Sequence, residues 1–436
     1  MAQTNSKRAR LLGSLGRFKN EKPPDGRTPA QRDRDRILYA GAFARLAEIT
    51  QVVSPDRGHV FHNRLTHSLK VGQIARRLAE HLNREQPNEA KNLGGLDPDA
   101  AEAAGLAHDL GHPPFGHIAE EELNELVQNA GLSDGYEGNA QSFRIVARLA
   151  SSDARDGTDR PIAGLNLTRM TLDGMLKYPW PHGDRQQPKK WGYYRTEADL
   201  FAWVRKGKRP RRRSAIAEIM DWADDITFAI HDLLDFYCAG KIPIDRCKGR
   251  PTNVERGRLI AGMFQRKPKW VSDREKYVEA LESILVWFPF EPEERYHGSI
   301  QDRAKLFDFS TGLIRYLVGS FRLRSDQNLP DSIAEIDPDA QRVVEVLKQF
   351  IWEYVIENPD LAVPQNGQRA AIRSVFKELL AASKLKKYYL FPMSHHQTIA
   401  RAHTKNERIR LVADCISGMT EREVMNIHRH LQGLSS

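Results

Sequence analysis

The sequence predicts an all-α protein, and two observations support this fold class. Apolar residues recur every three or four positions along several long segments, as on the buried face of an amphipathic helix. Few segments show the strict alternation of apolar and polar residues that marks a half-buried strand. The 436 residues, 40% of them hydrophobic, also suffice to bury a sizeable core. We therefore expect helices throughout most of the chain.

The helical pattern begins after a basic N-terminal segment. Residues 1–27 are basic, contain proline and glycine and lack periodicity, which predicts a flexible segment. The apolar stripe over 69–82 predicts an amphipathic helix. The alanine-rich stretch 100–107 predicts a buried helix that runs into His108.

The second half of the chain continues the same pattern. A stripe over 216–233, with Ser214 in position to cap its start, predicts a further helix. Six more segments with helical spacing follow it: 277–287, 300–321, 340–357, 368–384, 407–417 and 421–431.

Three segments do not fit the helical pattern. Turn residues at 54–58 allow one small β-hairpin near residues 52–61. Segment 151–162 is polar and rich in aspartate, and segment 178–194 contains prolines, glycines and two tryptophans. Long loops in compact domains are usually functional or disordered, so we expect the last two to lie over the site or at a subunit contact.

The charge distribution indicates contact with phosphates. The net charge is +9, and residues 205–213 (RKGKRPRRR) hold seven basic residues and no acid. Such a run attracts the phosphates of nucleotides or nucleic acid, although a solvated basic loop explains it equally well. The sequence has no apolar run of membrane-spanning length, no secretory signal and no paired cysteines among Cys238, Cys247 and Cys415. We expect a cytoplasmic protein without a membrane contact.

A set of histidines and aspartates suggests a metal site. His108 is followed directly by Asp109 at a helix end, so one nitrogen and one carboxylate face a common point. His67 can add a second nitrogen from a neighbouring helix, and the acidic segment 221–226 can supply a fourth ligand. Each part alone is more typical of ordinary core or surface residues. Together they form a mixed nitrogen and oxygen set that suits Mg, Mn, Fe, Ni or Zn.

The pattern of these residues resembles that of the HD-domain phosphohydrolases. More narrowly, the chain is similar to the bacterial deoxynucleoside triphosphate triphosphohydrolases, the dGTPase-like family. The matching stretches follow the family's order: RTPAQRDRDRILYAGAFARL (27–46), TQV (50–52), NRLTHSLKVGQIAR (63–76), GLAHDLGHPPFGHIAEEELN (105–124), YEGNAQSFRI (136–145), LTRMTLDGMLKYPW (167–180), KKWGYYRTE (189–197), ADDITFAIHDLLD (223–235) and RIRLVADCISGMT (408–420).

The resemblance implies a fold, a reaction and a metal site. It implies an HD-type helical catalytic core over 28–240, with helices of 241–436 packed on it. The family removes intact tripolyphosphate from a deoxynucleoside triphosphate and leaves the deoxynucleoside. Its cofactor is a divalent metal ion, Mg, Mn or another transition metal. The implied metal ligands in this chain are His67, His108, Asp109 and Asp224, with Asp225 as the near alternative to Asp224.

The resemblance also implies a catalytic pair. His117 and Glu120 stand where the family has its proton-transfer residues, and His112 stands where it contacts a phosphate. The H-x-x-E spacing supports this independently, because it places the carboxylate one helical turn from the imidazole. Glu120 can then orient His117 or raise its basicity.

Several further residues are implied to contact the substrate. Arg64 and Lys177 match residues that hold phosphates, and Gln51 matches one that reads the sugar or base. Tyr178 matches an aromatic that packs against the 2′-carbon and excludes ribonucleotides. The full implied set is Gln51, Arg64, Asn139, Lys177, Tyr178, Phe228 and Asp232. Phe228 departs from the family, which commonly has tyrosine there, so one hydrogen bond to the substrate is missing or replaced.

The resemblance further implies partners. The family forms homo-oligomers, often hexamers or tetramers, and some members respond to dNTPs or single-stranded DNA. Two other functions stay open: an HD phosphohydrolase acting on another nucleotide, and a regulator that senses nucleic acid or dNTPs. The basic segments favour the regulator, whereas the intact His117 and Glu120 pair favours the enzyme.

Overall fold

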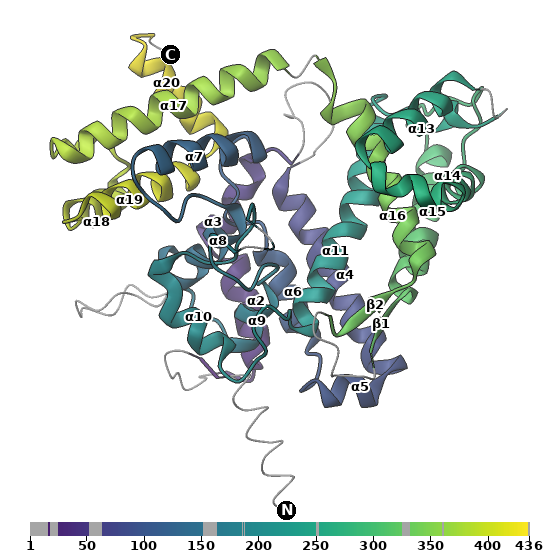
Figure 1. Ribbon diagram of the computed structural model, residues 1–436, viewed down its shortest axis with the longest axis horizontal. Coiled ribbons are helices and arrows are strands. Elements are labelled where there is room, and N and C mark those ends of the chain that lie inside the picture. Colours follow the sequence, from purple (N-terminus) through teal and green to yellow (C-terminus); the bar gives the residue numbers. More distant parts are fainter. Residues whose placement is uncertain are drawn as a thin grey trace, which may run out of the picture.

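The protein is helical, as the sequence predicts. The computed structural model describes residues 16–17, 25–51, 63–150, 164–184, 186, 188–249, 253–324, 332–359 and 362–434. In these ranges the regular structure is helical apart from one two-stranded sheet (Figure 1). None of the helices described has both the length and the hydrophobicity needed to cross a membrane.

Three helices form the centre of the molecule. α4 (Arg64–Glu85), α6 (Pro98–Ala107) and α11 (Ala215–Thr227) pack against one another. The tightest crossing is between α4 and α6, where a Cβ atom on Gly105 would lie 2.8 Å from the Cα atom of Gly72. Glycine at both positions therefore allows the two backbones to touch. This close crossing fixes the start of α4 relative to the end of α6.

Polar caps set the helix starts near the centre. Asn63 accepts a hydrogen bond from the Thr66 backbone N–H at 3.0 Å, which starts α4. Ser214 caps α11, as predicted. α11 then continues through one π-helical turn, Phe228–Asp232, into α12 (Leu233–Cys238). The predicted helix over 216–233 is thus two α-helices joined by a π-helical turn, which periodicity does not reveal.

The C-terminal half divides between two cores. α13, α14, α15 and α16 share the large core of the central helices. α17, α19 and α20 instead pack around α7 in a second core that includes Phe115, Leu123 and Val375. Figure 1 shows these two groups on opposite sides of the central helices. The chain's last helices therefore lie beside α7, although α7 is far away in the sequence.

The predicted C-terminal helices are all present. Their bounds are α14 Arg274–Trp287, α15 Ile300–Gly319, α16 Pro338–Ile351 with a π-helical turn Trp352–Ile356, α17 Ala362–Lys384, α19 Lys405–Ser417 and α20 Glu421–Leu431. Two further helices of this half, α13 Val254–Arg266 and α18 His396–Ala400, were not predicted. The other α-helices are α2 Pro29–Leu38, α3 Gly41–Ala44, α5 Pro87–Asn92, α7 His117–Asn129, α8 Gly138–Arg144 with a π-helical turn Ile145–Leu149, α9 Arg169–Gly174 and α10 Ala198–Arg205.

The described residues contain one sheet, which the sequence did not predict. β1 (Phe321–Leu323) pairs antiparallel with β2 (Ala334–Ile336), in the register Phe321 to Ile336. The sequence predicted helix up to Phe321, but α15 ends at Gly319. The hairpin predicted near 52–61 falls outside the described residues, as does the loop 151–162. The division into segments 1–27, 28–240 and 241–436 stays a prediction.

Candidate active site

The four predicted metal ligands meet where α4, α6 and α11 come together. His67 lies in the first turn of α4, His108 and Asp109 follow α6, and Asp224 lies in α11. The His67 Nε2 atom is 3.1 Å from the Asp224 Oδ1 atom, and the His108 Nε2 atom is 3.7 Å from the same oxygen. Ligand atoms of His67, His108 and Asp109 all lie within 4.8 Å of one another. The fold thus brings two imidazoles and two carboxylates close together.

The ring of His108 offers an unused lone pair at this point. Its Nδ1 atom donates to the Gly105 carbonyl oxygen at 2.6 Å, which assigns the proton of the neutral ring to Nδ1. Its buried Nε2 atom has no hydrogen-bond partner in the described part of the chain. That atom faces Asp109 Oδ1 at 3.3 Å. Two such atoms attract only when a cation lies between them, either a proton on the ring or a metal ion, so the cluster fits a metal ion.

Asp232 orients His67 from the other side. Its carboxylate lies 3.3 Å from the His67 Nδ1 atom, and only 1% of the residue is exposed. Burial opposes a charge on His67, but Asp232 and Asp224 outweigh it and raise the pKa of the imidazole to about 10. The pocket therefore favours a positive charge at this position. A carboxylate behind a metal-binding histidine is a common arrangement, and it leaves Nε2 for the metal.

Asp109 is buried between cationic and polar groups. The Arg64 guanidinium donates to its Oδ2 atom at 2.6 Å, and the His112 Nδ1 atom lies 3.0 Å from its Oδ1 atom. Burial opposes ionisation, yet His108, His112 and Arg64 hold the pKa of Asp109 well below its usual range. Asp109 is therefore a carboxylate, which is the form that binds a cation.

Asp224 and Asp225 point to different partners. Asp224 accepts a hydrogen bond from Lys177 at 3.0 Å and faces both histidines. Asp225 instead pairs with Lys348 of α16 at 2.7 Å. Asp224 is therefore better placed to bind a cation beside His67.

The second half of the site is built on the first turn of α7. The His117 Nδ1 atom lies 2.9 Å from the Glu120 Oε2 atom, and the imidazole of His117 packs edge-on against His112. The side chain of His117 is 68% exposed, whereas that of Glu120 is 9% exposed. A buried carboxylate thus supports an imidazole that is open to solvent and ligands.

Two residues of this half escaped the sequence analysis. Lys190 donates to the Glu120 Oε1 atom at 2.9 Å and lies 3.1 Å from the Glu137 Oε1 atom. Burial opposes ionisation of Glu120, but His117 and Lys190 hold its pKa well below its usual range. Burial and the charge of Glu120 instead raise the pKa of Glu137 to about 7. Lys190 lies in the segment 178–194, so the expectation that this loop lies over the site is met.

The other predicted substrate residues surround these two halves. Lys177 lies between Asp221, at 2.6 Å, and Asp224. Tyr178 packs edge-on against Trp180. Asn139 donates to the Glu137 carboxylate at 2.8 Å, so its amide is engaged by the protein. The remaining two are Gln51, whose buried Oε1 atom has no hydrogen-bond partner among the residues described, and the half-buried Phe228 at the π-helical turn.

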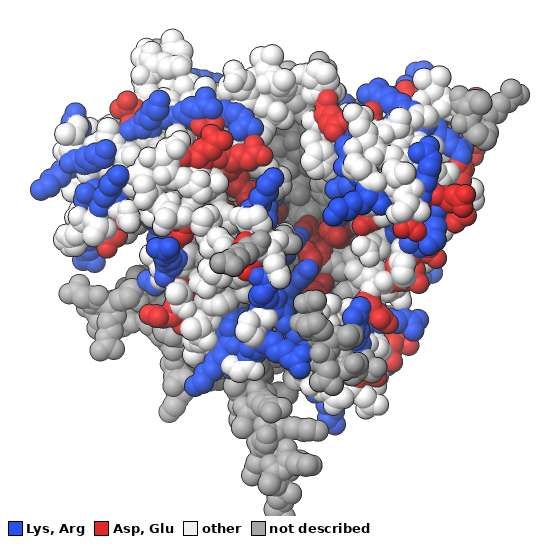
Figure 2. Space-filling model, in the orientation of Figure 1, with Lys and Arg blue, Asp and Glu red and all other residues white. Residues whose placement is uncertain are grey.

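The basic run at 205–213 is largely paired with acids. Arg205 and Lys208 both contact Asp173, and Arg213 contacts Asp221, which links the run to Lys177. Figure 2 shows acidic side chains in a hollow near the middle of one face, with Lys and Arg side chains beside them. The run is therefore neither a fully solvated loop nor a wholly free phosphate-binding patch.

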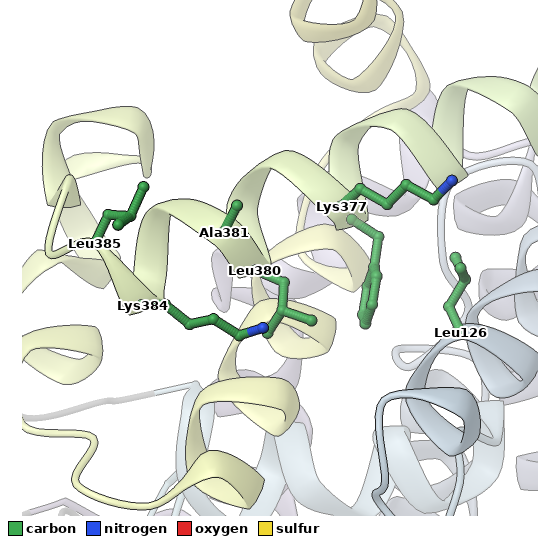
Figure 3. A pocket seen from close by; sticks show the side chains of 7 residues that line it. Leu126, Lys377, Leu380, Ala381, Lys384 and Leu385 are labelled. Atoms are coloured by element: carbon green, nitrogen blue, oxygen red, sulfur yellow. The ribbon is translucent and has the colours of Figure 1, made fainter.

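Two surface hollows are lined by other residues. One, of about 780 Å³, is lined by parts of α17 and α20 together with Thr50, Phe115 and Glu421. The other, of about 310 Å³, lies between Leu126 of α7 and α17, where Lys377 and Lys384 flank an apolar surface (Figure 3). Neither of these two hollows is lined by a predicted site residue.

Comparison with known proteins agrees with this geometry. A model of the HD domain matches residues 64–229, and a model of the phosphohydrolase-associated domain matches residues 334–430. A deoxyguanosinetriphosphate triphosphohydrolase-like protein of Streptomyces coelicolor is 35% identical over 444 aligned residues, which cover 96% of each chain. The chain belongs to this dGTPase-like family of HD-domain phosphohydrolases.

Other members of the dGTPase-like family match over a similar length. The one from Corynebacterium efficiens is 35% identical and covers 94% of this chain and 93% of its own. The one from Shewanella pealeana is 29% identical and covers 93% of this chain and 92% of its own. The HD match includes His67, His108, Asp109 and Asp224, and HD domains depend on a bound metal.

Proposed function

We propose that the protein hydrolyses deoxynucleoside triphosphates to a deoxynucleoside and tripolyphosphate. The observation that carries this proposal is the juxtaposition of a cation-binding cluster and a proton-transfer pair. His112 connects the two, because it lies 3.0 Å from Asp109 and its ring packs against His117. The names of the relatives support a deoxynucleoside triphosphate, dGTP among them, as the substrate.

His67, His108, Asp109 and Asp224 would hold the metal. A divalent ion bound there would polarise a phosphate oxygen and neutralise charge on the substrate. Asp232 would keep His67 in the tautomer that presents Nε2, at 3.3 Å from its Nδ1 atom. The ligand set admits Mg, Mn or another transition metal.

His117 and Glu120 would move the proton. Breaking the bond between the α-phosphorus and the 5′-oxygen requires a proton on the departing oxygen, and the exposed imidazole of His117 can deliver it. Glu120 faces the Nδ1 atom at 2.9 Å, so it orients the imidazole and directs Nε2 outward. Lys190 keeps Glu120 ionised.

Cations around the cluster would bind the phosphates. Arg64, Lys177 and Lys190 already lie beside carboxylates, so each is held in place before the substrate arrives. Such preorganisation lowers the entropy lost when the triphosphate binds. His112 would contact a phosphate oxygen, since its ring lies between Asp109 and His117.

The sugar would be selected by Tyr178 and Gln51. An aromatic ring against the 2′-carbon leaves no room for a 2′-hydroxyl, and the buried Oε1 atom of Gln51 is an acceptor without a partner among the described residues. Asn139 and Phe228 would complete the pocket, whereas Asp232, predicted to contact the substrate, is buried behind His67 and would act through that ring. Phe228 offers a ring but no hydroxyl, so this pocket makes one hydrogen bond fewer than a tyrosine would allow.

Product analysis tests the proposal. Metal-loaded protein is incubated with each of the four dNTPs and the four NTPs, and the products are separated by anion exchange. We expect tripolyphosphate and deoxynucleoside from dNTPs and at least tenfold slower turnover of NTPs. Pyrophosphate with dNMP, or orthophosphate with dNDP, would instead indicate an HD phosphohydrolase of another class. Binding without turnover would indicate a dNTP-sensing regulator.

The assembly and its effectors stay predictions of the family resemblance. We expect a homo-oligomer, a tetramer or hexamer, and activation by a dNTP or single-stranded DNA. Light scattering of the metal-loaded protein measures the first. Initial rates with and without a second dNTP or an oligonucleotide measure the second.

A further inference from the structure

Glu421, the first residue of α20, reaches into the catalytic half of the molecule. Its Oε1 atom accepts hydrogen bonds from the backbone N–H groups of Thr50 at 2.7 Å and of Phe115 at 3.1 Å. Its Oε2 atom accepts a third bond from the Thr50 hydroxyl at 2.9 Å. One carboxylate of the C-terminal helix thus joins two backbone segments that are far apart in the sequence.

Both segments lead directly into the site. Thr50 precedes Gln51, and Phe115 lies two residues before His117. The turn at Phe115 has a φ angle of 68°, which a residue with a side chain rarely adopts, and surrounding contacts must hold such a turn in place. The hydrogen bond from the Phe115 N–H to Glu421 is such a contact. Because α7 begins two residues later, this bond helps to set the direction in which α7 leaves the turn.

The next residue, Gly116, packs against Arg64, the arginine proposed to bind phosphate. A Cβ atom on Gly116 would lie 3.2 Å from the Nη2 atom of Arg64, and Gly116 has a φ angle of 61°. Only glycine fits this close approach without strain. A shift of the turn would therefore move His117 and disturb Arg64 together.

Arg45 links the start of the loop 110–116 to the turn 419–421 through hydrogen bonds to both. Its guanidinium donates to the carbonyl oxygens of Leu110 at 3.0 Å and His112 at 2.8 Å. It also donates to the Met419 carbonyl at 3.0 Å. The loop 110–116, which connects the metal-side residues to the proton-transfer pair, is therefore bound at both ends to the turn 419–421.

Glu421 is not needed to cap its own helix. The start of α20 is capped by Thr420 and Glu423, whose side chains each bond the other's backbone N–H, at 3.2 and 2.7 Å. The two acids of this first turn thus have different partners. Glu423 caps the helix, and Glu421 accepts hydrogen bonds from the loop before His117.

We propose that Glu421 is a positioning residue, which fixes the backbone before His117 and Gln51 and so sets the geometry of the proton-transfer pair. This inference rests on the proposed function, because it concerns the roles of His117 and Gln51. It gives the C-terminal helices an indirect part in catalysis, through the backbone at Thr50 and Phe115. It predicts that loss of the Glu421 carboxylate lowers kcat more than it raises KM.

The test compares three variants of the full chain: Glu421→Ala, Glu421→Gln and Glu423→Ala. The amide oxygen of Glu421→Gln can still accept from both N–H groups, and its NH₂ group can donate to the Thr50 hydroxyl. Glu423→Ala weakens the cap of the same helix turn but leaves the hydrogen bonds of Glu421 to Thr50 and Phe115 in place. Hydrogen exchange of peptides that contain Thr50 and Phe115 is measured with kcat, KM, bound metal and melting temperature.

In Glu421→Ala we expect exchange at both amides to be at least tenfold faster and kcat to fall tenfold or more, with bound metal unchanged. Glu421→Gln should keep kcat within about threefold of the original chain, and Glu423→Ala should lower only the melting temperature. Unchanged exchange in Glu421→Ala, or a kcat equal to that of Glu423→Ala, would overturn the proposal. If the unaltered protein turns over no dNTP, the proposed function fails. The exchange data would still test whether Glu421 holds the backbone at Thr50 and Phe115.

Discussion

The two halves of the candidate site differ in how they are held. His67, His108 and Asp109 are buried by the crossing of central helices and are 2 to 6% exposed. His117, by contrast, is open to solvent and depends on a loop, on Glu120 and on Lys190 from a second loop. The difference agrees with the different roles proposed for the two halves. A cation-binding cluster needs fixed, desolvated ligands, whereas a proton-transfer group must reach a ligand that enters and leaves.

The comparison predicts the largest effect for Asp109. Asp109→Ala removes a proposed ligand and leaves the buried guanidinium of Arg64 without its partner at 2.6 Å. We expect loss of bound metal, no measurable turnover and a stability loss of about 3–5 kcal/mol, the usual cost of breaking a buried ion pair. Elemental analysis, initial rates and urea unfolding measure the three effects.

Asp225→Asn is the matched control. Asp225 pairs with Lys348 rather than with the histidines. The variant should keep its metal and most of its turnover. If it lost the metal and Asp224→Asn kept it, the assignment of the fourth ligand to Asp224 would be wrong.

Glu120 tests whether the two halves are separable. Glu120→Ala leaves His67, His108, Asp109 and Asp224 untouched but removes the carboxylate behind His117. We expect full metal content and a loss of turnover of about 10²- to 10⁴-fold, the range typical of general acid–base groups. Metal analysis and kcat on one preparation check this, and full activity would exclude the pair from the mechanism.

Substitution of Lys190, which lies beside Glu120 in the same half of the site, should have a smaller effect. It lies between Glu120 and Glu137, at 2.9 and 3.1 Å, and reduces the repulsion of the two carboxylates. Lys190→Met should lower kcat/KM by about ten- to a hundredfold, and Lys190→Arg should recover part of it because the charge remains. Initial rates measure both. Equal loss in the two variants would point to the shape of the side chain rather than to its charge.

The smallest predicted effect is on the pH dependence of the free energy of unfolding, and it comes from His231. Burial and Lys70 lower the pKa of His231, next to Asp232, from 6.5 to about 4. Its neutral form therefore stabilises the fold fully above pH 6.5, and this contribution is lost as the pH falls toward 4. At pH 5 the loss is at most about 2 kcal/mol, less where solvent screens the ring.

Urea unfolding at pH 7.5 and pH 5.0 measures this loss. The original chain should lose about 1–2 kcal/mol more between the two pH values than His231→Gln does. His430→Gln alters an exposed histidine of α20 and should behave like the original chain. A His231→Gln variant with the same pH dependence as the original would show that this ring titrates normally.

The sequence predicted most of the helices because helical spacing is a short-range signal, whereas the site residues were expected from a family resemblance and their roles stay predictions. Helical spacing located α4, α6, α11 and the C-terminal helices, and the H…HD…D pattern located the cluster. β1 and β2 were missed because three residues are too few to show a period. The π-helical turn Phe228–Asp232 leaves no mark in the spacing either.

The contacts that complete the site depend on tertiary structure. Lys190 lies in an irregular loop, and nothing in its neighbourhood indicates a bond to Glu120. Asp224 and Asp225 are neighbours in the sequence, and only their tertiary partners distinguish them: Asp224 faces His67, whereas Asp225 pairs with Lys348. Glu421 contacts Thr50 and Phe115 across most of the chain length, which local patterns cannot reveal.

The central claim is that the buried cluster and the His117 and Glu120 pair act together on the α-phosphorus of a deoxynucleoside triphosphate. Turnover of dGTP in ¹⁸O-labelled water, followed by ³¹P NMR and mass spectrometry of the products, tests it most directly. The account predicts one ¹⁸O atom in the tripolyphosphate and none in the deoxyguanosine, because water attacks phosphorus and the 5′-oxygen leaves with the sugar. Label in the deoxyguanosine, or in pyrophosphate or orthophosphate released in its place, would contradict it.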